Sequence, residues 1–144
     1  MTIHHELPMA TMVLPAQLTS VTQWITFVAN CAIAEGVPPK RVAEIELAVE
    51  EALVNICQYA YRNNTGDVEV RCTRGREQRF LIELIDAGEP FNVLTMPPTE
   101  LTGNLDRRPV GGLGFLLMRS LVDNIAYRRE GSRNILQLTV QLPL

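Results

Sequence analysis

The sequence lacks several features that would point to particular classes of protein. It has no apolar run near the roughly 20 residues that a membrane-spanning helix needs, and its N-terminus has no basic stretch followed by an apolar core, as signal peptides do. Basic residues are not in excess, because 13 Lys and Arg stand against 16 Asp and Glu, a net charge of −3. This balance argues against the basic surface of a typical nucleic-acid binder. We therefore expect a cytoplasmic protein that binds neither membrane nor nucleic acid directly.

Cysteine is also scarce. Cys31, Cys57 and Cys72 are odd in number and far apart, which fits neither a disulfide framework nor a CxxC metal site. We expect all three to be reduced and mostly buried. The 144 residues are enough to form one domain with its own core. Since no linker, repeat or low-complexity tract divides the chain, a single domain over residues 1–144 is expected.

The spacing of apolar residues changes along the chain and predicts the order of its elements. A spacing of three and four indicates a helix, whereas alternation indicates a strand with one buried face. The expected elements are an edge strand near 7–16 between prolines, helices over 18–35 and 40–62, strands over 68–73 and 80–84 with a turn around Gly75, a helix over 115–124, and a hairpin over 125–142. This order predicts an α+β fold, a two-layer α/β sandwich whose mixed, mostly antiparallel sheet has helices on one face and water on the other.

The first candidate site is the stretch EEALVN in the second helix. Glu51 and Asn55 are four residues apart and therefore share one side of the helix. A carboxylate and an amide oxygen at this spacing can hold a hydroxyl proton and a hard cation such as Mg²⁺. A solvated surface pair is the more frequent reason for this spacing.

The second candidate is IDAGEPF. Asp86 has the same parity as Ile82 and Leu84, which places its carboxylate on the buried side at the end of a strand. A buried charge needs a dedicated partner. That partner is either a donor of the protein, such as a loop amide, or the exocyclic amine of a base, with Gly88 leaving room for a flat ring.

A long irregular tract and a glycine turn follow. Residues 92–110 contain prolines and a glycine but no sustained period, and loops of this length are often lids, with simple disorder as the alternative. GGLGF, at 111–115, precedes a helix whose first free amides can bind phosphate. A plain glycine turn is the commoner cause. Neither GxxxxGK[ST] nor a GxGxxG after a strand is present.

The order of these four features resembles the GHKL ATP-binding fold of histidine kinases, gyrase B and the mismatch-repair MutL proteins, over essentially the whole chain. Within it, EEALVNICQYAY, DAGEPF and GGLGFLLMRSLVD are most similar to the bacterial anti-sigma serine kinases of the RsbW and SpoIIAB type. The resemblance implies a protein kinase that uses ATP and Mg²⁺, that phosphorylates a serine of an anti-sigma-factor antagonist of the STAS fold, and that sequesters a sigma factor. Such kinases are commonly homodimers.

The resemblance also implies a role for individual residues. Asn55 matches the asparagine that binds magnesium, and Glu51 matches the glutamate proposed as the base for the substrate serine. Asp86 matches the aspartate that reads the adenine amine, with Gly88 beside it. The turn that holds the phosphates under the lid (92–110) corresponds to Gly112, Leu113 and Gly114.

One departure from the family pattern concerns charge near the site. Tyr59 stands where these kinases usually have histidine, and a tyrosine donates a hydrogen bond without carrying positive charge near neutral pH. The lid has no lysine, which leaves Arg107 and Arg108 as the nearby cations for a γ-phosphate. The main alternative to a kinase is a nucleotide-gated binding module that does not phosphorylate its partner, followed by an interaction domain with an empty pocket.

Overall fold

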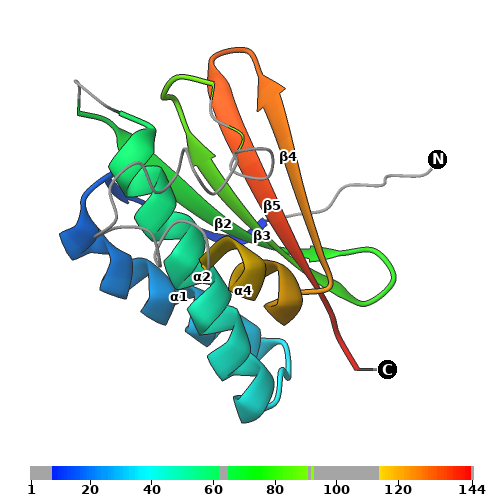
Figure 1. Ribbon diagram of the computed structural model, residues 1–144. Coiled ribbons are helices and arrows are strands. Elements are labelled where there is room, and N and C mark those ends of the chain that lie inside the picture. The colour runs from blue at the N-terminus through cyan, green and yellow to red at the C-terminus, as the bar shows by residue number, and fades with distance from the viewer. Residues whose placement is uncertain (1–7, 62–64, 91, 93–113, 144) are drawn as a thin grey trace.

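The computed structural model describes residues 8–61, 65–90, 92 and 114–143 (Figure 1). The elements follow the predicted order. They are β1 (Pro8–Pro15), the 3-10 helix η1 (Leu18–Ser20), α1 (Val21–Ala34), α2 (Pro39–Tyr59), β2 (Asp67–Gly75), β3 (Arg79–Asp86), α4 (Gly114–Leu121), β4 (Asn124–Glu130) and β5 (Arg133–Gln141). No helix within these ranges is both long enough and apolar enough to cross a membrane.

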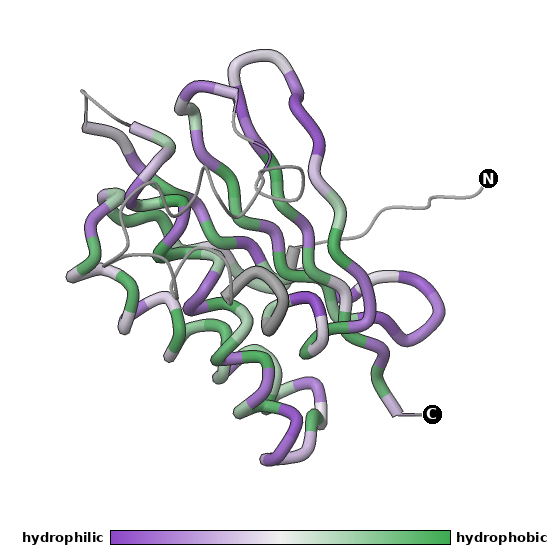
Figure 2. The backbone as a smooth tube through the Cα atoms, viewed as in Figure 1, coloured by the Kyte–Doolittle hydropathy of each residue, from purple (hydrophilic) through white to green (hydrophobic). Residues whose placement is uncertain are grey.

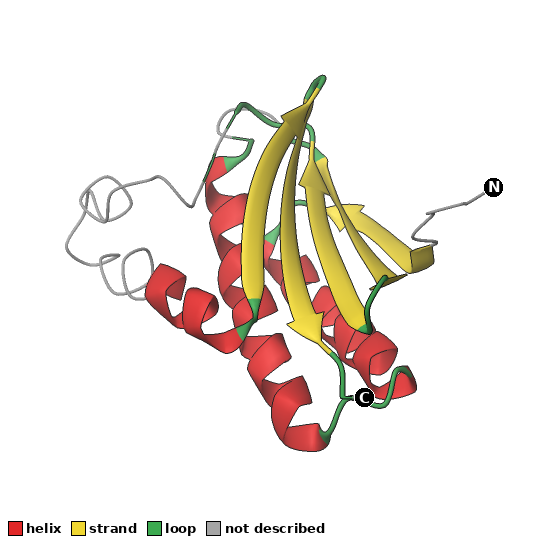
Figure 3. Cartoon of the chain, turned by 90° about the vertical axis from the view of Figure 1, so that its right-hand side faces the viewer, coloured by secondary structure: helices red, strands yellow, loops and turns green. Residues whose placement is uncertain are grey.

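The strands form one sheet and the helices form a second layer. The order in the sheet is β1-β2-β3-β5-β4, and every neighbouring pair is antiparallel. Helices α1, α2 and α4 cover one face of this sheet, as Figures 1 and 3 show from two sides. The predicted α+β sandwich is confirmed, and the strand bounded by Pro8 and Pro15 lies at the sheet edge as expected.

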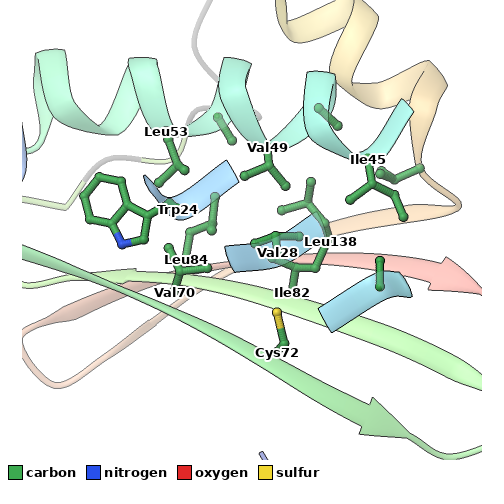
Figure 4. Close-up of a cluster of buried hydrophobic side chains, with 14 of the residues drawn as sticks. Trp24, Val28, Ile45, Val49, Leu53, Val70, Cys72, Ile82, Leu84 and Leu138 are labelled. Atoms are coloured by element: carbon green, nitrogen blue, oxygen red, sulfur yellow. The ribbon is translucent and has the colours of Figure 1, made fainter. Parts of the chain in front are cut away.

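The core lies between the two layers. Alternate residues of the strands point toward the helices, and the apolar stripes of α1 and α2 pack onto them. Figure 2 shows hydrophobic residues recurring along these helices and strands. Figure 4 labels the centre of this cluster, which comprises Trp24, Val28, Ile45, Val49, Leu53, Val70, Cys72, Ile82, Leu84 and Leu138. Trp24 is fully buried, so this aromatic residue belongs to the core.

The junction between the two long helices is set by glycine and proline. Gly36 has a φ of +84°, the left-handed conformation that ends many helices. The amide of Val37 donates to the Ala32 carbonyl (3.1 Å) and that of Gly36 to the Ile33 carbonyl (3.0 Å). Pro39 then occupies the first position of α2, where a missing N–H costs nothing. The chain therefore reverses within a few residues, and α2 runs back across the sheet.

The β2–β3 turn lies at residues 76–78, directly after Gly75, which is the last residue of β2, close to the expected place. Glu77 and Gln78 adopt positive φ values of 60° and 62°. The sequence did not predict these values, because non-glycine residues seldom adopt this conformation.

The expectation that water covers the sheet face left open by the helices is wrong for the centre of the sheet, although residues of the edge strands on that face, such as Val13 and Arg128, are exposed. Side chains of β3 and β5 on that face are buried, namely Leu81, Glu83, Ile85, Ile135 and Thr139. Arginines of neighbouring strands reach Glu83, since Arg71 lies 3.6 Å and Arg128 lies 3.2 Å from its carboxylate oxygens. Long arginine stems cover apolar surface while their charged heads stay in water.

The cysteines are free thiols, as expected. Cys72 is buried, whereas Cys31 and Cys57 are half-buried.

Candidate functional site

Asn55 lies on the buried side of α2 and presents an oxygen that has no hydrogen-bond partner among the described residues. Its side chain is 1% exposed, and its Nδ2 donates to the backbone carbonyl of Glu51 one turn earlier, at 3.0 Å. That bond fixes the orientation of the amide, so Oδ1 points away from the Glu51 carbonyl and can accept a hydrogen bond. Among the described residues, Oδ1 is buried and accepts no hydrogen bond. An orphaned acceptor costs about 1–3 kcal/mol, and such a group calls for a ligand.

Glu51 presents a second orphaned oxygen one turn before the first. Its Oε2 is buried and has no hydrogen-bond partner within the described part of the chain. Burial raises the pKa of this carboxyl, and the neighbouring charge of Glu50 raises it further. A carboxylate whose ionised form is poorly solvated has a strengthened tendency to take a proton. The helix therefore carries a potential base and a potential oxygen ligand on the same side.

The raised pKa makes Glu51 a source of instability in the ligand-free protein. Because the ionised form is disfavoured in the fold, stability falls as pH rises from the ordinary value of 4.5 through the higher folded pKa. We expect Glu51→Gln to increase the free energy of unfolding at about pH 8, and the gain to vanish below about pH 4.5. Urea titrations of both proteins across this range measure the difference. A gain that stays constant with pH would contradict the assigned cause.

Asp86 ends β3 with a buried carboxylate, as its parity predicted. The residue is 4% exposed, and its Oδ1 accepts hydrogen bonds from the Asn134 Nδ2 (2.8 Å) and the Gly88 amide (2.9 Å). Burial raises the pKa of Asp86 despite these bonds and the nearby charge of Arg129. Protein donors therefore satisfy one oxygen. The described hydrogen bonds leave Oδ2 as an acceptor for another group.

Asn134 holds Asp86 in place and was not among the predicted site residues. Its Nδ2 also donates to the Glu89 carbonyl (2.8 Å), and its Oδ1 accepts from the Tyr127 hydroxyl (2.5 Å) and from Arg129 (3.1 Å). Both ends of the amide are thus engaged, so its orientation is fixed. An asparagine with the parity of the apolar positions of β5 was the signal that could have revealed it.

The loop after Asp86 is fixed to the end of α2. The Tyr61 hydroxyl accepts from the Ala87 amide (2.7 Å) and donates to the Asp67 carbonyl (2.8 Å), and the Glu89 amide donates to the Ala60 carbonyl (3.3 Å). A side chain at Gly88 would overlap the Ala60 carbonyl, which is a structural reason for glycine there. The approach of a flat ring to Gly88 stays a prediction.

These contacts place the two halves of the candidate site near each other. Asn55 precedes Ala60 by five residues, which corresponds to about 7.5 Å along the helix axis, and Ala60 contacts Gly88. A cavity of about 950 Å³ lies beside this loop, with Tyr61 and Arg129 in its wall. Glu51 and Asn55 do not line that cavity.

The remaining predicted site residues are described in part or not at all. Gly114 is the first residue of α4, so its placement at a helix N-terminus agrees with the prediction. Gly112, Leu113, Arg107, Arg108 and all of the predicted lid except Asn92 lie outside the described residues.

Comparison with known proteins identifies the family. Residues 14–140 match the histidine kinase-like ATPase domain family, which is most of the chain. The chain belongs to this family. The GHKL resemblance seen in the sequence is thereby confirmed. The matched residues include both α2 and the loop after Asp86.

Curated relatives carry the name of a serine kinase. The serine-protein kinase RsbW of Bacillus licheniformis is 34% identical over 90 residues, which cover 58% of this chain and 55% of that protein. RsbW of Bacillus mycoides is 26% identical over 129 residues, covering 87% and 80%. The first of these matches therefore spans about half the length of the relative.

Solved structures share the fold at low identity. The histidine kinase domain of the Erythrobacter litoralis EL346 blue-light activated histidine kinase has a TM-score of 0.59 at 20% identity, over 85% of this chain and 61% of that one. The SiaB–SiaC complex from Pseudomonas aeruginosa has a TM-score of 0.56 at 13% identity, over 92% and 89%.

The residues present fit the ligand that this family implies. Asn55 Oδ1 is a buried oxygen without a hydrogen-bond partner among the described residues, the type of ligand that Mg²⁺ takes. Asp86 holds a buried carboxylate at the other end of the candidate site, a group that accepts hydrogen bonds from an amine.

Proposed function

We propose that this protein is an anti-sigma regulatory factor with protein serine kinase activity, which transfers the γ-phosphoryl group of ATP to a serine of a STAS-domain antagonist and sequesters a sigma factor. The relatives named as serine-protein kinases support the activity. The observation that carries it is a pair of buried oxygens one turn apart on α2, Glu51 Oε2 and Asn55 Oδ1, which have no hydrogen-bond partner in the described part of the chain. We also propose that the protein is located in the cytoplasm.

The two ends of the site bind different parts of the nucleotide, the adenine at one end and the phosphates at the other. Asp86 accepts a hydrogen bond from the adenine amine through Oδ2, while Asn134 and the Gly88 amide keep the carboxylate in position. The backbone amides of Gly112, Leu113 and Gly114 bind phosphate oxygens at the start of α4, and the segment 92–110 closes over them. Asn55 Oδ1 binds Mg²⁺, which supplies neutralisation of phosphate charge when it is bound.

Glu51 serves as the base. The serine Oγ forms a bond to the γ-phosphorus, the bond between that phosphorus and the oxygen of ADP breaks, and the serine proton moves to Glu51. A carboxylate with a raised pKa is a better proton acceptor than an ordinary one. Since phosphoryl transfer depends mainly on positioning and electrostatics, Glu51 chiefly orients the hydroxyl.

The kinase test uses ATP labelled at the γ-position and a STAS-domain anti-sigma-factor antagonist as the substrate protein. We expect label on a serine of that protein, because Glu51, the proposed base, and Asn55, the proposed magnesium ligand, lie one turn apart on α2. Omission of Mg²⁺ by chelation is expected to abolish the transfer. A partner that binds in the presence of ATP but acquires no label would instead support the nucleotide-gated binding module, which Tyr59 in the histidine position favours.

A further inference from the structure

Arg129 of β4 is held next to the Asp86 loop by contacts to neutral oxygens. Its Nη1 donates to the Gly88 carbonyl (2.8 Å) and to Asn134 Oδ1 (3.1 Å), and its Nε donates to the Gly131 carbonyl (3.2 Å). The side chain also forms part of the wall of the cavity of about 950 Å³ beside this loop. Because these acceptors are neutral, they orient the guanidinium without cancelling its charge.

The hydrogen bonds run in one direction, from Arg129 through Asn134 to Asp86. Asn134 accepts at Oδ1 and donates from Nδ2 to Asp86 Oδ1 (2.8 Å). A guanidinium has donors and no acceptor, so Arg129 can bond only the oxygen end of the Asn134 amide. The Tyr127 hydroxyl also donates to that oxygen, but a hydroxyl can equally accept from a nitrogen. Arg129 is therefore the group that keeps the nitrogen of Asn134 on Asp86.

The same guanidinium holds the loop that supplies the second donor to Asp86. The Gly88 amide donates to Asp86 Oδ1 (2.9 Å), while the Gly88 carbonyl accepts from Arg129 (2.8 Å). Both donors of Asp86 are thus positioned by Arg129. A carboxylate that accepts such hydrogen bonds is favoured in its ionised form.

The charge of Arg129 acts in the same sense as these hydrogen bonds. Burial raises the pKa of Asp86, whereas the bonds from Asn134 and Gly88 and the charge of Arg129 lower it. Loss of the guanidinium would remove the charge and loosen both donors, so the pKa of Asp86 would rise further. Arg129 therefore opposes the protonation that burial favours.

Other ionisable groups near Asp86 belong to several elements. The Tyr61 hydroxyl of α2 is neutral because burial raises its pKa, and Glu89 of the loop is exposed. Three further charged side chains share a small cavity with Asp86, namely Asp67 and Glu69 of β2 and Arg133 of β5. The cation among these three is exposed and lies 3.1 Å from the Glu69 carboxylate, whereas Arg129 is half-buried. Arg129 is therefore the cation with the stronger effect on Asp86.

We propose that Arg129 is a positioning residue that keeps Asp86 ionised and oriented as an acceptor, and that it thereby makes the site selective for adenine over guanine. Adenine presents an amine where guanine presents a carbonyl oxygen. An ionised carboxylate accepts from the amine and repels the oxygen, whereas a protonated one can donate to the oxygen. The inference rests on the proposed function and adds the residue that sets the base preference of its nucleotide site.

Titrations of Arg129→Gln with ATP and with GTP at several pH values test this role. Glutamine keeps a donor for the Gly88 carbonyl but carries no charge. Relative to the native protein at the same pH, the dissociation constant for ATP should rise at least about 10-fold between about pH 8 and about pH 5.5, the effect of one hydrogen bond to a charged group. This ratio cancels protonation of the nucleotide itself. The preference for ATP over GTP should fall over the same range.

Arg128→Gln is the matched control, because it removes the same charge from the adjacent position of β4. Arg128 points to the other face of the sheet, where its Nη2 donates to Glu83 Oε2 (3.2 Å). This variant should keep the native pH dependence of ATP binding. Arg129→Lys restores a positive charge and should restore the pH profile, which a purely structural role of the side chain would not do. Melting curves check that each variant keeps the fold.

Titration of the Asp86 carboxyl needs no nucleotide. Its carboxyl carbon, assigned in NMR spectra by its loss in Asp86→Asn, should titrate at higher pH in Arg129→Gln than in the native protein or Arg128→Gln. Equal midpoints in the two arginine variants overturn the inference, as does an ATP-to-GTP preference that the two share at every pH. A native protein that binds neither nucleotide contradicts the proposed function instead, and the carbon titration then still decides whether Arg129 controls Asp86.

Discussion

Glu51→Gln is expected to lower the rate of serine phosphorylation at least about 100-fold, the usual contribution of a general base, while the dissociation constant of ATP changes little. The amide keeps the size of the side chain but takes no proton. The carboxylate oxygen that it replaces, Oε2, has no hydrogen-bond partner among the described residues. Phosphorylation rates at saturating ATP, with calorimetric titrations of the same proteins, measure both quantities.

Glu50→Gln is the matched control. Glu50 is adjacent in sequence but exposed, being rotated about 100° around the helix. Its charge contributes to the raised pKa of Glu51, so the control should stay active and shift the acid limb of the pH–rate profile to lower pH. If Glu51→Gln and Glu50→Gln reduce the rate equally, or if Glu51→Gln weakens ATP binding as much as it slows transfer, Glu51 is not the base.

Asp86→Asn is expected to weaken ATP binding roughly 10- to 100-fold, because a hydrogen bond to a charged group contributes about 1.5–3 kcal/mol. The substitution replaces one carboxylate oxygen by an amide nitrogen, a donor, in a side chain that already accepts hydrogen bonds from two donors. Asn134 Nδ2 and the Gly88 amide already donate to Oδ1, so the new nitrogen occupies the Oδ2 position. There it meets the adenine amine, and two donors face each other.

Base selectivity separates this role from simple damage to the fold. Guanine has an acceptor where adenine has its amine, so the ratio of ATP to GTP affinity should fall in Asp86→Asn, since the variant can donate to that acceptor. Asp67→Asn is the control, since in the described structure Asp67 contributes a backbone carbonyl to Tyr61. Equal losses for ATP and GTP, at an unchanged melting temperature, would contradict the adenine-reading role.

Much of the fold was predictable because its signals are local. The three-and-four spacing along α2 and the alternation along β2, β3 and β5 follow directly from which side of each element is buried. The edge position of β1 followed from its prolines. The buried outer face was not predictable, because its cover comes from Arg71 and Arg128 on neighbouring strands, and strand order is not visible in a single sequence.

The candidate site, like the fold, was predictable only in part. Glu51, Asn55 and Asp86 were found from spacing and parity, and the structure gives each a buried oxygen. The groups that hold them were missed. Asn134 reaches Asp86 across β3 and β5, and Tyr61 reaches Ala87 from the far end of α2. Such contacts join residues distant in the chain, so their partners emerge only once the strands are paired.

The most direct test is a crystal structure of the protein with Mg²⁺ and a non-hydrolysable ATP analogue. The account predicts one ligand between α2 and the end of β3, with its adenine amine on Asp86 Oδ2 and the metal on Asn55 Oδ1. A nucleotide bound elsewhere, or bound without contact to either of these oxygens, would contradict it.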